Sequence, residues 1–290
     1  MKFNEEEIYG YPRTIRTLSR PIRHVISIAE KAAYWRGLIS AHELRLPDFL
    51  GIGAPQSGTT WLHRNLSLHP GLFLPRTEKS LHFFDRNFHR SLRTYARVFS
   101  EARPDQLCGE VTPGYGRLSI DQIRFIHLIM PNVRLVYIAR HPVYQMLSRA
   151  RRALGKKGYK SFDDLSREEA DRLVLTFTER VGHYAQGVTS ASHADVIENW
   201  LSVFPREQLH VVIFDDIRAD AARVLNSVYD HIGAERVPLP PGFDEKVNSN
   251  PTAKVPDRFS EILWGQYEDQ VRRLKELLGS RVAHWLVDSE

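Results

Sequence analysis

The chain has 290 residues, of which 42% are hydrophobic and 26% charged, so it can bury a full hydrophobic core and has the size of one α/β domain with additions. Its single cysteine, Cys108, excludes an internal disulfide and any metal or redox site built from several cysteines. The net charge of +5 suits an anionic ligand. Because no basic tract is interleaved with aromatic residues, the composition gives little support to nucleic-acid binding.

The N-terminal region is expected to form an addition to the main domain. Its first residues are acidic and lack an apolar core segment, and no apolar run in the chain has the length of a membrane span, so we expect a cytoplasmic protein without a membrane helix. Residues 1–47 are expected to form a helical extension and residues 48–290 the main domain, with the oligomeric state left open. The extension has one apolar helical face, which we expect to pack on the core: Ile22, Val25, Ile26, Ala29, Ala32 and Ala33.

Strand-like and helical patterns alternate through the main domain. The strand-like runs are residues 49–53, 81–84, 107–110, 133–139 and 209–214. Between and after them, apolar residues at helical spacing predict one helix that ends near Pro131 and a long last helix that ends at Gly279. Such alternation indicates a parallel sheet that is covered on both faces by helices.

The segment Gly-Ala-Pro-Gln-Ser-Gly-Thr-Thr at residues 53–60 follows the first strand-like run and precedes a helical pattern. This order of strand, glycine turn and helix start aims backbone N–H groups and the positive end of the helix dipole at an anion. Thr59 stands where a nucleoside triphosphatase has lysine, which argues against ATP or GTP turnover. The hydroxyl groups of Ser57, Thr59 and Thr60 can still complete a cradle for a 5′-phosphate.

Arg140 directly follows the fourth strand-like run, and Ser148 comes eight residues later. A guanidinium offers a planar pair of donors to phosphate oxygens, and a nearby hydroxyl can add a third. With this pair the chain resembles the sulfotransferase family, which uses 3′-phosphoadenosine 5′-phosphosulfate as donor. The resemblance implies that residues 53–60 bind the 5′-phosphosulfate and that Arg140 and Ser148 bind the 3′-phosphate.

Three further segments carry the resemblance, which begins near residue 47. Residues 78–85, EKSLHFFD, are similar to the EKEVHFFD segment of the branch that includes the heparan sulfate-type glycan sulfotransferases and their bacterial relatives. Residues 109–115 are similar to its GEKTPxY segment, and Trp200 with residues 209–216 to its W…F…VVxYEDL region. The fold that the resemblance implies is α/β and three-layered, with a central parallel sheet, helices on both faces and a P-loop NTPase-like topology.

The resemblance also implies roles for individual residues. His82 is the first candidate for the base that takes the proton of the acceptor hydroxyl, with Glu110 and Glu78 as alternatives, although Glu110 can equally be a structural carboxylate. Lys79 is the cation that can replace the lysine charge that this chain lacks at Gln56. No metal is expected. The expected donor-binding residues are Pro55, Gln56, Ser57, Gly58, Thr59, Thr60, Trp61, Arg140, Ser148, Asn248 and Lys254.

Three departures from the family pattern each remove a charge. Gln56 replaces the lysine of the phosphate loop, Ser80 the glutamate that follows Lys79, and Val111 the lysine of the EKTP segment. Loss of charge near a transferring sulfuryl group weakens transition-state stabilisation. The sequence therefore predicts sulfuryl transfer to a hydroxyl of a carbohydrate or small metabolite. The alternatives are a donor-binding protein whose catalysis is lost or altered, and a kinase-like nucleotide enzyme.

A run of cations between residues 149 and 160 favours an acidic acceptor or completes the donor pocket.

Overall fold

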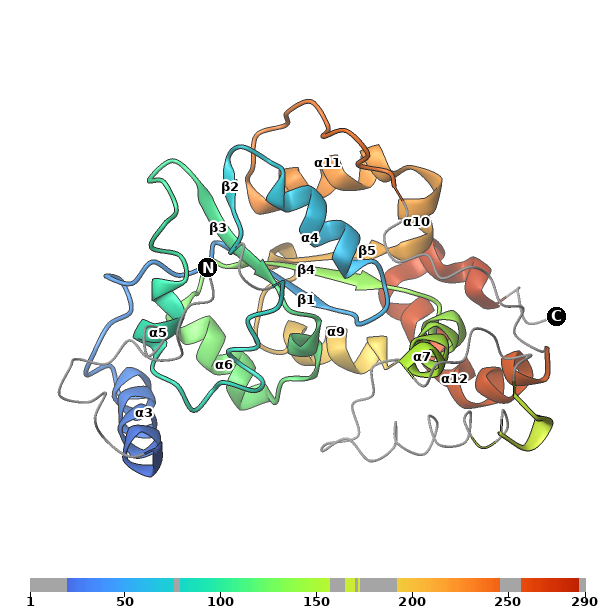
Figure 1. Cartoon of the computed structure of the whole chain (residues 1–290), viewed down its shortest axis with the longest axis horizontal. Coiled ribbons are helices and arrows are strands. Elements are labelled where there is room, and N and C mark those ends of the chain that lie inside the picture. Colours follow the sequence, from blue (N-terminus) through green and yellow to red (C-terminus); the bar gives the residue numbers. More distant parts are fainter. Residues whose placement is uncertain are drawn as a thin grey trace.

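A computed structural model describes residues 20–75, 79–156, 165–169, 172, 192–245 and 257–286 (Figure 1). The α-helices in these ranges are α3 (Arg20–Trp35), α4 (Thr59–Ser67), α5 (Leu92–Arg97), α6 (Ile120–Ile129), α7 (Pro142–Lys156), α9 (His193–Leu201), α10 (Phe214–Ala219), α11 (Ala221–Ile232) and α12 (Asp257–Leu278). The strands are β1 (Phe49–Gly53), β2 (Leu72–Phe73), β3 (Leu107–Val111), β4 (Arg134–Ala139) and β5 (Leu209–Ile213), and the short 3₁₀ helices are η1 (Pro113–Arg117), η3 (Arg206–Gln208) and η4 (Gly279–Leu286).

The strands form one parallel sheet with the order β2-β3-β1-β4-β5. β1 lies at the centre of the sheet. From β1 the chain passes to β2 and β3 on one side, and it then returns to β4 on the other side. The carboxyl end of β1 is therefore a topological switch point, the place where open parallel sheets bind their ligands.

Each face of the sheet carries its own hydrophobic core, because successive side chains of a strand point to opposite faces. In β4, Leu135, Tyr137 and Ala139 belong to one buried cluster, and Val136 and Ile138 belong to the other. Helices α6 and α9 cover the first face, and α4 and α11 cover the second (Figure 1). The three-layer α/β architecture expected from the sequence is confirmed.

One predicted strand is wrong, and one short strand was missed. Residues 81–84 form an irregular segment and a turn, whereas the edge of the sheet next to β3 is the two-residue strand β2. His82 has a φ of +52°, a left-handed conformation that a strand does not contain. Phe83 and Phe84 are buried by ring contacts, with Tyr95 4.6 and 5.1 Å from their respective centroids, so their apolar character reflects core packing rather than strand pairing.

Helix α3 packs on the core as expected, but through a different face. Its buried residues in the described part are Ser27, Lys31 and Tyr34, whereas Val25 is 63% exposed. The Lys31 ammonium and the Ser27 hydroxyl both donate to the carbonyl of Arg90 at 2.8 Å. The spacing of apolar residues could not predict this face of α3, because hydrogen bonds from polar side chains hold it against the rest of the protein.

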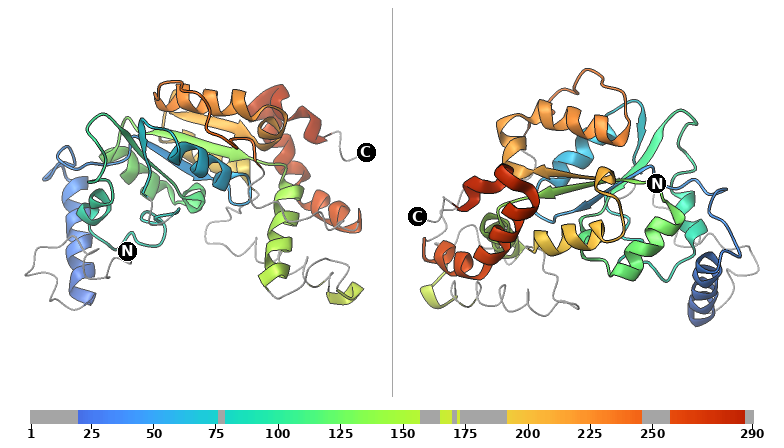
Figure 2. Two further views of the ribbon diagram at one scale, coloured as in Figure 1. Left: turned by 45° about the horizontal axis from the view of Figure 1, so that its top comes forward. Right: turned by 180° about the vertical axis from the view of Figure 1, so that it is seen from behind.

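Helices lie at both ends of the molecule. Figures 1 and 2 place α3 at one end and α7 with α12 at the other.

Two helices end where the sequence predicts. Helix α6 stops before Pro131, and α12 stops at Gly279, whose φ of +66° ends the helix. Within the described ranges, none of the helices combines the length and the apolar character needed to span a bilayer.

Candidate active site

The loop between β1 and α4 has the geometry of an anion cradle. Gly58 precedes the first residue of α4 with a φ of +90°, and Gln56 also has a positive φ, of +63°. The first i→i−4 hydrogen bond of α4 runs from Leu62 N to Gly58 O at 3.0 Å. The N–H groups of residues 59–61 therefore have no acceptor within the helix, and they project from its positive end.

Arg140 and Ser148 converge on this loop. The guanidinium Nη1 of Arg140 donates to the backbone oxygen of Gln56 at 2.8 Å, and the Ser148 hydroxyl donates to Gln56 Oε1 at 3.4 Å. Arg140 directly follows β4, the neighbour of β1 in the sheet, and Ser148 lies on α7. Residues more than 80 positions apart in the sequence thus form one site at the switch point.

The Arg140 guanidinium is held from several sides. Burial lowers its pKa to about 10, and the charge of Asp215 opposes that shift. The guanidinium carbon lies 4.5 Å from the centroid of the Phe214 ring, and His193 Nε2 contacts the Arg140 carbonyl oxygen at 2.8 Å. Burial lowers the pKa of His193 to about 4, and Tyr137 holds the other ring nitrogen at 2.6 Å. A neutral imidazole therefore fixes the backbone behind the guanidinium.

Gln145 is a residue of the site that the sequence did not predict. Its amide Nε2 donates to Pro55 O at 2.8 Å and to the Ser57 hydroxyl at 3.3 Å. The only signal in the sequence is its position on the helix that joins Arg140 to Ser148. Gln145 fixes the shape of the phosphate loop from the side of α7.

Lys79 reaches the start of α4. Its ammonium donates a hydrogen bond to the hydroxyl of Thr60, the second residue of the helix. Burial, with repulsion from Arg152 as the second cause, lowers the pKa of Lys79 to about 8. A cation with a pKa of about 8 therefore lies against the anion cradle.

His82 forms a dyad with Asp85, a residue that was not predicted as part of the site. Nδ1 of His82 lies 2.8 Å from Asp85 Oδ2, and their side chains are 23% and 19% exposed. Gly114 allows this contact, because a Cβ at that position would lie 2.3 Å from the same carboxylate oxygen. With Nδ1–H donating to Asp85, Nε2 is left to accept a proton. The available signal was an Asp three residues after the His in one motif.

Glu110 has the environment of a structural carboxylate. It is 1% exposed, and it accepts hydrogen bonds from the hydroxyl groups of Tyr95, Tyr115 and Thr112. Burial raises the pKa of Glu110, and these three hydroxyls act in the opposite direction. A carboxylate enclosed by three protein donors is poorly placed to reach an acceptor molecule, which favours the structural alternative over the catalytic one.

Two of the departures from the family pattern turn away from the cradle. The Ser80 hydroxyl donates to the backbone oxygen of Val111 at 3.2 Å, and the Val111 side chain is fully buried in the core on the α4 face. The Trp61 indole also points away from the cradle, because its N–H donates to Phe243 O at 2.5 Å. The remaining expected site residues, Glu78, Asn248 and Lys254, lie outside the described residues.

The chain belongs to the sulfotransferase family, because residues 46–249 match the model of the sulfotransferase domain. It is 32% identical over 196 residues to heparan sulfate glucosamine 3-O-sulfotransferase 6 of Mus musculus, an alignment that covers 67% of this chain and 54% of that protein. It is 28% identical over 204 residues to heparan sulfate glucosamine 3-O-sulfotransferase 3A1 of Mus musculus, which covers 69% and 49%. The chain spans about half the length of the curated relatives that it matches.

Among solved structures, a sulfotransferase from Alicyclobacillus acidocaldarius is similar with a TM-score of 0.63 and 22% identity, covering 83% of this chain and 98% of that one. At this identity the likeness concerns the fold alone. It agrees with the α/β fold and its central parallel sheet. By sequence the chain is therefore a member of the sulfotransferase class, and its fold agrees with that membership.

Proposed function

We propose that this chain transfers a sulfuryl group from 3′-phosphoadenosine 5′-phosphosulfate to a hydroxyl of a carbohydrate or small-metabolite acceptor by in-line displacement. The observation that carries the proposal is the convergence of Arg140 and Ser148 on Gln56 in the phosphate loop. One site thereby offers a helix N-terminus to one phosphate group and a guanidinium with a hydroxyl to a second. The glycan sulfotransferases among the relatives support a hydroxyl-bearing glycan as one class of acceptor.

The donor would be held at both of its phosphorylated ends. The free N–H groups at the start of α4, with the hydroxyls of Thr59 and Thr60, suit the 5′-phosphosulfate. Arg140 uses one of its five N–H donors on Gln56 O, so others remain for the 3′-phosphate. The cradle contributes backbone dipoles and neutral hydroxyls, and Lys79 and Arg140 contribute the positive charge.

The chemical step has simple requirements. The acceptor oxygen forms a bond to sulfur while the bond from sulfur to the bridging phosphate oxygen breaks, and the acceptor proton leaves to a base. His82 can take that proton at Nε2, and Asp85 then stabilises the imidazolium that forms. Lys79 lies beside Thr60, where negative charge would develop on the leaving phosphate.

A donor-binding protein with lost or altered catalysis is the second candidate. The observation that favours it is the Ser80 hydroxyl, which stands where the family pattern has a glutamate and donates to the backbone oxygen of Val111. A neutral, hydrogen-bonded hydroxyl cannot act as a carboxylate base.

Calorimetric titration with adenosine 3′,5′-bisphosphate, followed by a sulfate-transfer screen over hydroxyl compounds, separates the two candidates. We expect both binding and transfer. Binding without transfer to any acceptor would favour the second candidate, and absence of binding would contradict both.

A further inference from the structure

A cavity of about 560 Å³ opens beside the His82–Asp85 dyad, between α3 and the segment 85–89. One wall comes from α3 and includes Ile28, Ala32 and Trp35. The facing wall includes Asp85, Arg86 and Phe88. Cavities of 300–1,000 Å³ are typical of sites for small molecules. This volume is therefore large enough for an aryl or branched alkyl group.

The walls of this cavity are mainly apolar. Ile28, Ala32 and Trp35 follow one another at positions i, i+4 and i+7, so they form a single stripe along α3. Ile28 and Trp35 are large apolar side chains that remain 54% and 48% exposed. Phe88 completes the surface from the other side, with its ring 5.4 Å from that of Phe125. Covering this stripe with an apolar group would remove its surface from water.

Specific polar contacts fix the two walls to each other. The Lys31 ammonium donates to Ser27 Oγ at 2.6 Å and to Arg90 O at 2.8 Å. One oxygen of Glu30 accepts from the Ser91 hydroxyl at 2.9 Å, and the other accepts from Leu92 N at 3.2 Å. The cavity is thus framed by a docked helix, and the Lys31 charge is already engaged by protein acceptors.

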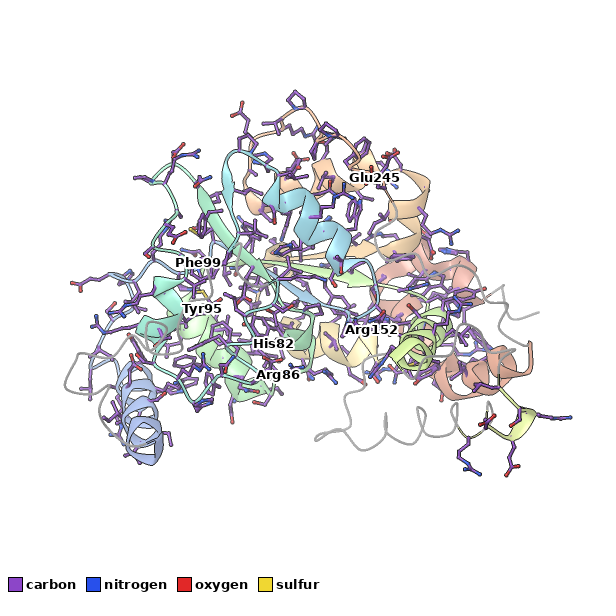
Figure 3. All side chains as sticks on the ribbon, in the orientation of Figure 1. His82, Arg86, Tyr95, Phe99, Arg152 and Glu245 are labelled. Carbon is purple, nitrogen blue, oxygen red and sulfur yellow. The ribbon has the colours of Figure 1, made fainter. Side chains whose placement is uncertain are left out.

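The cavity borders the proposed reaction centre through Asp85. Asp85 lines the cavity, and the same carboxylate accepts the Nδ1–H of His82. Arg86 N donates to the His82 backbone oxygen at 3.1 Å, and Figure 3 shows the two side chains in the same region of the molecule. A molecule whose hydroxyl contacts His82 could therefore place its remaining part between α3 and Phe88.

Two charged groups of the cavity are already engaged by the protein. The Lys31 ammonium is held by Ser27 Oγ and Arg90 O, and Asp85 Oδ2 lies 2.8 Å from His82 Nδ1. The α3 wall also precedes residue 46, where the match to the sulfotransferase domain begins. This part of the cavity is consequently an addition to the shared domain rather than a feature of it.

We propose that the cavity binds the aryl or branched alkyl group of the acceptor, so that the chain prefers a small hydroxyl compound with such an apolar substituent to the same compound without one. This proposal rests on the proposed function for the reacting hydroxyl. In this proposal α3 selects the acceptor, whereas the loop and the strand ends of the central sheet bind the donor.

Binding of phenyl β-D-glucopyranoside and of methyl β-D-glucopyranoside, measured by calorimetry without any donor, tests the cavity directly. The phenyl glucoside should bind at least about tenfold more tightly. Ala32→Phe, which fills the cavity, and Ile28→Ser, which removes apolar surface, should each abolish the difference. The control is Val25→Ser, because Val25 is 63% exposed on the same helix and does not line the cavity. Equal affinities in the parent protein, or a preference that survives Ala32→Phe, would overturn the proposal.

Sulfate transfer from 3′-phosphoadenosine 5′-phosphosulfate to the same two glucosides separates this proposal from the proposed function. If the phenyl glucoside binds in the cavity and no sulfate is transferred, the cavity assignment stands and the enzymatic one fails. If both glucosides are sulfated with equal kcat/KM, the enzymatic assignment stands and the cavity assignment fails. An acidic glucuronosyl-glucosamine disaccharide that binds more tightly than the phenyl glucoside, and loses affinity in Ala32→Phe, would assign the cavity to a glycan and overturn the proposal.

Discussion

Replacing Arg140 by alanine should severely weaken the binding of adenosine 3′,5′-bisphosphate. The half-buried guanidinium has a pKa of about 10, so it is cationic at pH 7. It donates one hydrogen bond to Gln56 O at 2.8 Å. Removing one partner of a desolvated, hydrogen-bonded charge pair costs about 2–4 kcal/mol. At 1.4 kcal/mol for each factor of ten, the Kd should rise roughly 30- to 700-fold.

Calorimetry at pH 7 measures this change. Arg134→Ala is the matched control, since Arg134 lies at the other end of β4 and is exposed, and its guanidinium donates to Glu207 O at 3.2 Å. Arg140→Lys should give an intermediate Kd, because lysine keeps the charge and loses the planar pair of donors. An Arg140→Ala variant that is folded by circular dichroism and keeps its Kd within about threefold of the parent would refute the 3′-phosphate site.

Three other changes probe the remaining groups of the site. Asp85→Asn should lower kcat by roughly 10- to 100-fold and leave the Kd of the bisphosphate unchanged, because the carboxylate acts through His82 rather than on the donor. An unchanged kcat would show that the His82–Asp85 dyad has no part in the mechanism. With a pKa of about 8, Lys79 loses its charge as the pH rises, so kcat/KM should fall above pH 8, and Lys79→Gln should remove that alkaline limb. Glu110→Ala should lower the free energy of unfolding in urea by about 2–4 kcal/mol, because three buried hydroxyls lose their acceptor. A stable Glu110→Ala variant without turnover would instead support Glu110 as the base.

The sequence predicted those parts of the molecule that depend on local order along the chain. The loop at 53–60 could be assigned because a strand, a glycine turn and a helix start follow one another. Arg140 could be assigned because it closes a strand. Since the carboxyl ends of parallel strands meet at one edge of the sheet, local patterns also placed Arg140 near that loop.

The remaining features depend on contacts between distant residues. The run at 81–84 resembles a strand by composition, yet ring packing against Tyr95 accounts for its burial. The docked face of α3 is polar because Lys31 pairs with Arg90 O, 59 residues away. Gln145 reaches Ser57 across 88 residues. Neither periodicity nor motif spacing contains such pairings.

The support behind Arg140 makes the site sensitive to acid. His193 has a pKa of about 4 in the folded protein, against about 6.5 for an exposed histidine, so between these values the unfolded chain binds the additional proton. The stabilisation from this neutral imidazole is complete above pH 6.5 and is lost as the pH falls toward 4. Protonation would disturb the Tyr137–His193–Arg140 connection at the end of β4. Acidification to about pH 4 should therefore weaken the support that His193 gives to the Arg140 backbone, whereas the Arg140 guanidinium, with a pKa of about 10, keeps its charge.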